Sequence, residues 1–110
     1  MVNMSSPFGG QVRTRALIAL ALLGQSYPRE LARILAAPVS GVQVALRGLE
    51  RDGLVAGRLV GRTRLYELEP RYFALAELRP YLMRLAAGDP DLTAAVESLR
   101  RRPRRSGKPL

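Results

Sequence analysis

Cysteine, histidine and tryptophan are all missing from this sequence of 110 residues. Without cysteine and histidine, neither a Ser–His nor a Cys–His nucleophile pair can form, which closes the usual routes of acyl transfer. Imidazole and thiolate are also the usual ligands of transition metals in proteins, so a metal site of that kind is excluded. The absence of cysteine further means that the chain forms no disulfide.

Acidic residues are few and scattered. Among the nine of them, Asp89 and Asp91 form a close pair whose spacing is typical of a capped helix start rather than of a metal site. Glycine is present but makes no phosphate-binding loop, because Gly9-Gly10 and Gly61-Arg62 lack the flanking pattern. We therefore expect no catalytic residue, no metal and no cofactor, and we do not expect an enzyme.

Long apolar runs are missing as well. The longest, residues 16–23, has eight residues, whereas a helix that spans a bilayer needs about 20. The first residues lack the charged and apolar regions of a signal peptide. The expectation is a cytoplasmic protein with no membrane partner, formed as one domain that buries roughly 65% of its unfolded surface.

Positive charge is abundant and unevenly placed. The net charge is +9, and six cations lie after residue 99: Arg100, Arg101, Arg102, Arg104, Arg105 and Lys108. Removing these six from +9 leaves only +3 for residues 1–99. The basic tail alone is a weak indication of nucleic-acid binding, and it becomes a stronger one beside a DNA-binding fold.

The stretch from Glu30 to Gly53 has the pattern of a helix-turn-helix. Leu31 and Leu35 lie at helical spacing, and after Pro38 a second apolar stripe contains Val39, Val42, Leu46 and Leu49. Pro38 disfavours one continuous helix and can occupy the first turn of the second one. Gly53 is expected to end that second helix. Two helices joined by a tight turn are typical of DNA-binding proteins, in which the second helix enters the major groove.

A β-hairpin is predicted directly after these helices. Residues 54–59 and 63–69 have the composition of strands, and residues 60–62 that of a turn. The predicted fold class is therefore mainly α with one β-hairpin, namely a winged helix-turn-helix with additional C-terminal helices. The winged domain is assigned to residues 11–69.

The flanking segments complete the predicted organisation. Residues 1–10 are expected to form a flexible arm, followed by a buried helix over residues 11–23 and a helix that starts at Pro28. After the predicted hairpin of residues 54–69, which is called the wing, residues 70–102 are assigned to C-terminal helices that dimerise. The first of these, residues 71–87, is expected to kink or divide at Pro80, and the second to run from Pro90 to Arg102. Residues 103–110 are predicted to be a disordered basic tail.

The ordered set of residues resembles a known family. The residues that carry the resemblance are Glu30-Leu31-Ala32, Ser40, Val42, Leu46, Leu49-Glu50, Gly53-Leu54-Val55, Gly61-Arg62 and Tyr66-Glu67-Leu68. They resemble the winged helix of ArsR-type transcriptional regulators. Arg13-Thr14-Arg15 and Ala76-Glu77-Leu78-Arg79 are similar to the metal-free subgroup, which is sometimes linked to nucleotidyltransferase domains. The resemblance covers roughly residues 8–99, and it implies a dimeric regulator that binds DNA. ArsR-type metal sensors bind their metal through Cys or His. This chain lacks both, so metal sensing by that route is excluded.

The second helix offers few groups that could read bases. The outward positions assigned to DNA binding are Ser40, Gln43, Val44 and Arg47. Gln43 can pair with adenine, Arg47 can pair with guanine or phosphate, and Val44 or Ala45 can touch a thymine methyl group. The family usually has more polar residues at the start of this helix. Either a few contacts together with DNA shape provide specificity, or this surface has partly moved to another use.

On the predicted wing, three arginines are assigned to DNA binding: Arg58, Arg62 and Arg64. Arginine at a hairpin tip suits phosphates or the minor groove. The alternative is that these charges only protect an exposed hairpin from pairing with other strands.

The apolar residues of the last two predicted helices are assigned to dimerisation: Leu78, Leu82, Leu85, Leu92, Val96 and Leu99. They supply more apolar surface than a winged helix of about 60 residues needs, and a two-fold dimer accounts for the surplus. The alternative is that they pack on the core of their own chain.

These observations predict a sequence-specific regulator of transcription that binds double-stranded DNA as a homodimer. Two other functions stay open. The chain could be an adaptor that binds a separately encoded partner protein, or a non-specific nucleic-acid binder that acts through its tail.

Overall fold

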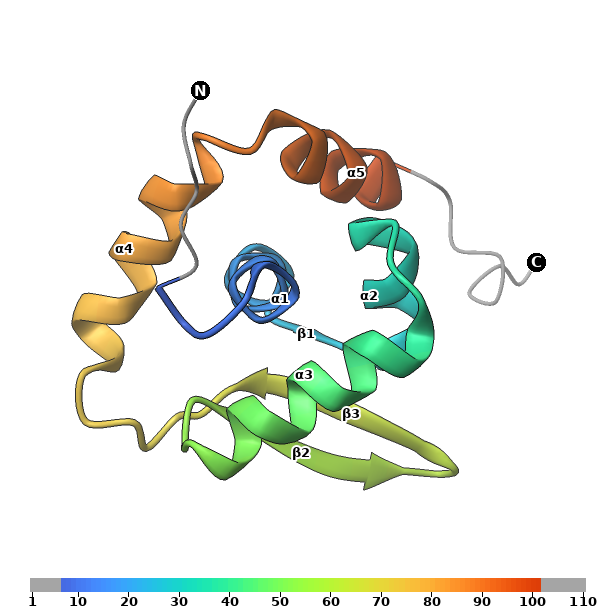
Figure 1. The fold of residues 1–110 in the computed structure, drawn as a ribbon, viewed down its shortest axis with the longest axis vertical. Helices are drawn as coiled ribbons and strands as arrows, with labels where there is room; N and C mark the ends of the chain where they lie inside the picture. The colour runs from blue at the N-terminus through green and yellow to red at the C-terminus, as the bar shows by residue number, and fades with distance from the viewer. Residues whose placement is uncertain (1–6, 102–110) are drawn as a thin grey trace.

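The computed structural model describes residues 7–101, which form helices and one small sheet around a common core (Figure 1). The helices are α1 (Gln11–Leu23), α2 (Pro28–Leu35), α3 (Val39–Arg51), α4 (Leu75–Ala86) and α5 (Pro90–Arg101). The strands are β1 (Gln25–Ser26), β2 (Val55–Val60) and β3 (Thr63–Leu68). Most of the expected arm and the whole expected basic tail lie outside the described residues.

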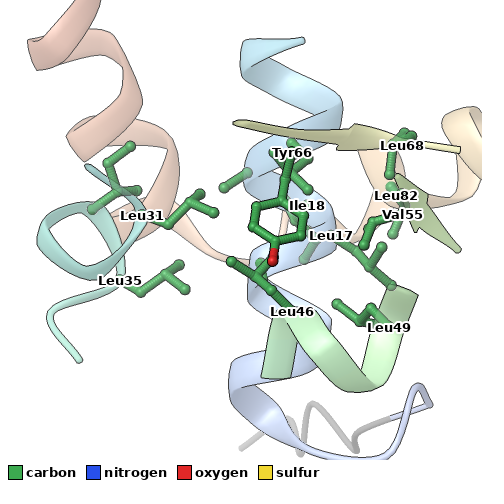
Figure 2. Packing of buried hydrophobic residues seen from close by; sticks show 14 of the residues in the cluster. Leu17, Ile18, Leu31, Leu35, Leu46, Leu49, Val55, Tyr66, Leu68 and Leu82 are labelled. Carbon is green, nitrogen blue, oxygen red and sulfur yellow. The ribbon is translucent and has the colours of Figure 1, made fainter. Parts of the chain in front are cut away.

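Helix α1 occupies the centre of the molecule, as expected from its apolar sequence. Residues 16–20 are fully buried, because α2, α3, α4, α5 and β3 all pack around this helix. Figure 1 looks nearly along its axis and shows the other elements arranged around it. In Figure 2, Leu17 and Ile18 lie among side chains of α2, α3, the sheet and α4. The apolar part of α1, residues 16–23, is therefore the common core element, while Arg13 and Arg15 near its start form ion pairs.

The predicted helix-turn-helix is confirmed in α2, the turn and α3. The turn is made at Ala36, whose φ of +54° is left-handed, and the Ala37 N–H donates to the Ala32 carbonyl at 3.0 Å. Pro38 is the cap of α3 rather than its first helical residue, one position from the expectation. Val42, Leu46 and Leu49 are buried as the stripe predicted.

The predicted hairpin is confirmed and is joined by a third strand. β2 and β3 pair antiparallel from Val55 opposite Leu68 to Val60 opposite Thr63. Gln25 and Ser26 were expected to be only a connection, yet they pair with Glu67 and Tyr66, which gives the sheet order β1-β3-β2. Two residues are too short a segment for hydrophobic periodicity to reveal a strand.

The C-terminal helices differ from the expectation in two respects. α4 begins at Leu75 rather than Arg71, because a turn comes first, in which the Tyr72 N–H donates to the Glu69 carbonyl at 3.1 Å. The division at Pro80 is wrong, since α4 continues through this residue as one helix. α5 starts at Pro90 as predicted, and Asp89 caps it by accepting a hydrogen bond from the Leu92 N–H at 3.2 Å.

The apolar residues assigned to dimerisation require a correction. Leu78, Leu82, Leu92 and Val96 are buried within their own chain, and Leu85 and Leu99 are partly buried against the same core. They therefore pack on the core of their own chain, which was the stated alternative, because the apolar residues 16–23 of α1 take up the inward faces of α4 and α5. The prediction of a dimer is not tested by a single chain and stays a prediction. The four buried side chains offer no free surface in this chain, whereas Leu85 and Leu99 stay partly exposed.

The observed fold is mainly α with a winged helix-turn-helix and two further helices, as predicted from the sequence. Within residues 7–101 no helix combines the length and the hydropathy that a membrane crossing requires.

Candidate nucleic-acid interface

One face of α3 is free of the core and carries the residues predicted to read DNA. Ser40, Gln43, Val44 and Arg47 are all exposed, and Val44 retains 61% of its accessible surface. Ala45 is instead buried, so the suggested contact of its methyl group with thymine is wrong. Exposure at these positions agrees with the helical stripe, and their contact with DNA stays a prediction.

The C-terminal half of α3 is fixed to α1. Arg13 donates from Nη2 to Asp52 Oδ2 at 2.6 Å, and it also donates to the Phe8 carbonyl. The helix can approach Arg13 closely because residue 48 is glycine; a Cβ there would lie 2.4 Å from Arg13 Nη1. The position of the exposed face is therefore set by a contact between elements that are distant in sequence.

The wing is fixed to α3 through Arg64. Its guanidinium donates to Glu50 Oε2 at 3.0 Å and to the Gly57 carbonyl at 3.3 Å, and it lies 5.8 Å from the centre of the Tyr66 ring. The hydrogen bond to Glu50 is the main reason why the pKa of Arg64 is raised above its ordinary value. Arg64 is therefore engaged within the chain, and its charge is partly neutralised.

Gly57 makes this arrangement possible. A Cβ at that position would lie 2.8 Å from Tyr66 Cε1 and 2.9 Å from Arg64 Nε, which no real side chain tolerates without displacement. A side chain at this position would require Tyr66 or Arg64 to shift. Glycine usually weakens a strand, and here the close approach of Tyr66 and Arg64 explains its presence.

The other two wing arginines remain available. Arg62 lies in the two-residue turn at the tip, and Arg58 is exposed with a long hydrogen bond of 3.4 Å to Gln25. Figure 1 shows α3 alongside the β2–β3 hairpin. Arg58 pairs with Leu65 in the strand register and lies on the alternate face of the sheet from Arg64, which contacts Glu50 of α3. Leu59 and Val60 near the tip are also exposed, and Leu59 retains 67% of its surface.

The structure thus separates the predicted residues into two groups. On α3 and the β2–β3 hairpin, the exposed cations without an ion-pair partner among residues 7–101 are Arg47, Arg51, Arg58 and Arg62. Arg64 is a positioning residue, and Glu50 and Arg13 are positioning residues that the sequence reasoning missed. Glu50 and Arg64 are 14 residues apart in the sequence and meet only because the wing folds against α3. The sequence therefore gives no local signal for this pair. Within the part of the chain that is described, no group of three or more His, Cys, Asp or Glu could hold a metal ion.

Comparison with solved structures identifies the fold. Two structures of Lactococcus lactis ZitR variants are similar. One, in apo form, has 19% identity and a TM-score of 0.56 over 80% of this chain and 64% of that chain. The other has 17% identity and a TM-score of 0.61 over 90% and 66%. The adhesin competence repressor AdcR from Streptococcus pyogenes gives 18% identity and a TM-score of 0.56 over 86% and 68%.

These likenesses concern the fold, since sequence identity is low throughout. The chain spans about two thirds of the length of the ZitR chains. No protein-family model matches the sequence, and no curated protein sequence matches it. The ArsR subgroup and its link to nucleotidyltransferases accordingly stay a resemblance. What the geometry and the solved structures together establish is a winged helix-turn-helix fold.

Proposed function

We propose that this protein is a DNA-binding regulator of transcription. The observation that carries the proposal is the exposure of four arginines on α3 and the wing, Arg47, Arg51, Arg58 and Arg62, none of which has an ion-pair partner among residues 7–101. Unpaired cations beside an exposed helix suit the phosphates that flank a major groove. One solved structure of similar fold is named a repressor, and the proposed site of action is the cytoplasm.

In this proposal α3 enters the major groove. Gln43 would pair with adenine, Arg47 with guanine or a phosphate, and Val44 would contact a thymine methyl group. Ser40, near the start of the helix, suits a phosphate. Arg58 and Arg62 would contact the backbone beside the groove, and Arg64 would hold the wing at its distance from α3. As a homodimer, the protein would place two such helices on two half-sites.

A second function is favoured by one observation. Val44, Leu59 and Val60 are large apolar residues that remain exposed on α3 and the wing. Such residues on a surface with few polar reading groups suit an adaptor that binds a separately encoded protein. A third possibility, binding to any nucleic acid through the basic tail, follows from the charge of residues 100–110.

One binding experiment separates the three. The full chain is titrated with its own upstream DNA and with random duplex of equal length, in low and in moderate salt. We expect Gln43→Ala or Arg47→Ala to cost about 1–3 kcal/mol, chiefly on the preferred sequence. Arg62→Ala should weaken binding to both duplexes and reduce the slope of log K against log salt by roughly 0.9. Arg71→Ala, with the same charge change at an exposed position in the turn before α4, is the control.

Equal affinity of the unmodified chain for both duplexes would contradict specific regulation and favour the non-specific binder. Absence of binding to either duplex at low salt would contradict both and favour the adaptor.

A further inference from the structure

The outward face of α4 carries an apolar stripe that its own chain does not bury. Ala76, Pro80, Met83 and Ala87 are exposed at alternating spacings of four and three residues, and Met83 retains 47% of its surface. Phe73, in the turn before the helix, retains 92%. This stripe lies opposite Leu78, Leu82 and Ala86, which pack on α1. Spacing of this kind is typical of a helix that packs against another helix.

The stripe is complementary to itself when it is reversed. In an antiparallel pair of α4 helices related by a two-fold axis at Pro80, the small Ala76 faces the large Met83 of the other copy. Phe73 likewise lies at the level of Ala87, and Pro80 meets Pro80. Large residues facing small ones allow two helices to approach closely along their whole contact.

The charges beside the stripe follow the same symmetry. Glu77 and Arg84 flank it on one side, and neither has an ion-pair partner among residues 7–101. Seven residues separate them by about 10 Å along the helix, which is too far for a direct contact within one chain. In the antiparallel pair, Glu77 of one copy comes beside Arg84 of the other, twice by symmetry. On the opposite flank Arg79 lies near its own copy, and its long side chain can turn toward solvent.

We propose that α4 is the surface on which a second copy of this chain docks, antiparallel about a two-fold axis at Pro80. The inference rests on the proposed homodimer and is independent of DNA binding. The proposed dimer surface is the exposed face of α4, which lies opposite the buried Leu78 and Leu82 on the same helix. Figure 1 shows α4 at the edge of the molecule, with α1 on its inner side.

The size of the contact sets the expected strength. α4 has 12 residues and is about 18 Å long, so this contact alone buries less than the 1,200–2,000 Å² that is typical of stable complexes. We therefore expect an equilibrium between monomer and dimer that shifts with protein concentration. Sedimentation of the full chain should approach twice the chain mass of 12.1 kDa as concentration rises.

A charge exchange gives the decisive test. Glu77→Arg or Arg84→Glu alone should raise the dissociation constant of the dimer roughly tenfold, because two attractive pairs become repulsive. The double variant Glu77→Arg with Arg84→Glu should restore the dimer. Met83→Glu should give a monomer, and Ala94→Glu on α5, also exposed, is its matched control. Thermal melting of each variant checks that its fold is retained.

Covalent trapping tests the position of the axis directly. Because the chain has no cysteine, Pro80→Cys introduces a single thiol, which should form a disulfide with its copy under a mild oxidant. Ala94→Cys should not. A dimer that is unaffected by Met83→Glu, or that the double charge exchange fails to restore, would overturn the proposal.

A wild-type chain that stays monomeric at every concentration would also overturn it, and would leave residues 1–6 or another protein as what covers the stripe. Loss of DNA binding with an intact dimer would overturn the proposed function and leave this inference standing.

Discussion

At the scale of single residues, Ala36 is the position where sequence and backbone disagree. Its φ of +54° is the left-handed conformation, which costs a residue with a Cβ roughly 1–2 kcal/mol. Ala36→Gly removes that cost but adds flexibility to the unfolded chain worth about 0.4–1 kcal/mol. We therefore expect a net gain in the free energy of unfolding of about 0.5–1 kcal/mol, measured by urea denaturation.

The neighbouring alanine provides the control. Ala37 does not have a positive φ, so Ala37→Gly should only lose stability. If Ala36→Gly were as destabilising as Ala37→Gly, the turn would not carry the strain described.

At the scale of elements, one ion pair joins three helices. Arg15 on α1 donates from Nε to Asp89 Oδ2 at 2.8 Å and from Nη1 to the Leu35 carbonyl at 3.2 Å. Asp89 is also the cap of α5, and the pair is largely shielded from solvent. The arginine therefore connects the end of α2 to the start of α5 across the central helix.

Removal of this carboxylate should be costly. Asp89→Ala deletes a charged hydrogen bond and a helix cap, so we expect a loss of about 2–3 kcal/mol in the free energy of unfolding. Asp91→Ala, an exposed acid in the first turn of the same helix, should cost less than about 1 kcal/mol. Chemical denaturation of both variants measures the difference, and equal losses would show that the link to Arg15 adds nothing.

At the scale of the whole molecule, charge is divided between the fold and the tail. A chain ending at Pro103 lacks Arg104, Arg105 and Lys108 but keeps α5 complete. If the tail contacts DNA, affinity should fall equally for preferred and random duplex, and the salt slope should shrink by up to about 3. Gel shifts at several salt concentrations measure both quantities.

Melting of the shortened chain separates lost contacts from lost folding, since an unchanged melting temperature excludes the latter. Loss of discrimination between the two duplexes on truncation, with discrimination intact in Arg47→Ala, would mean that α3 is not the reading surface.

Local residue patterns were enough to predict the order and type of almost every element. The stripe of Val42, Leu46 and Leu49 requires an amphipathic helix, and Pro38 requires a break before it, because both are local consequences of backbone geometry. The same stripe shows which side of α3 faces outward, so Ser40, Gln43, Val44 and Arg47 were found exposed as expected.

How these elements meet depends on contacts between residues that are distant in sequence. β1 exists because β3 offers a free edge to Gln25 and Ser26, and Arg64 is engaged because the wing brings it to Glu50. The apolar residues of α4 and α5 could equally have faced a partner or their own core, since periodicity gives a face and does not name its neighbour. In the folded chain they face the apolar residues 16–23 of α1, and the opposite face of α4, with Met83 and Pro80, stays exposed.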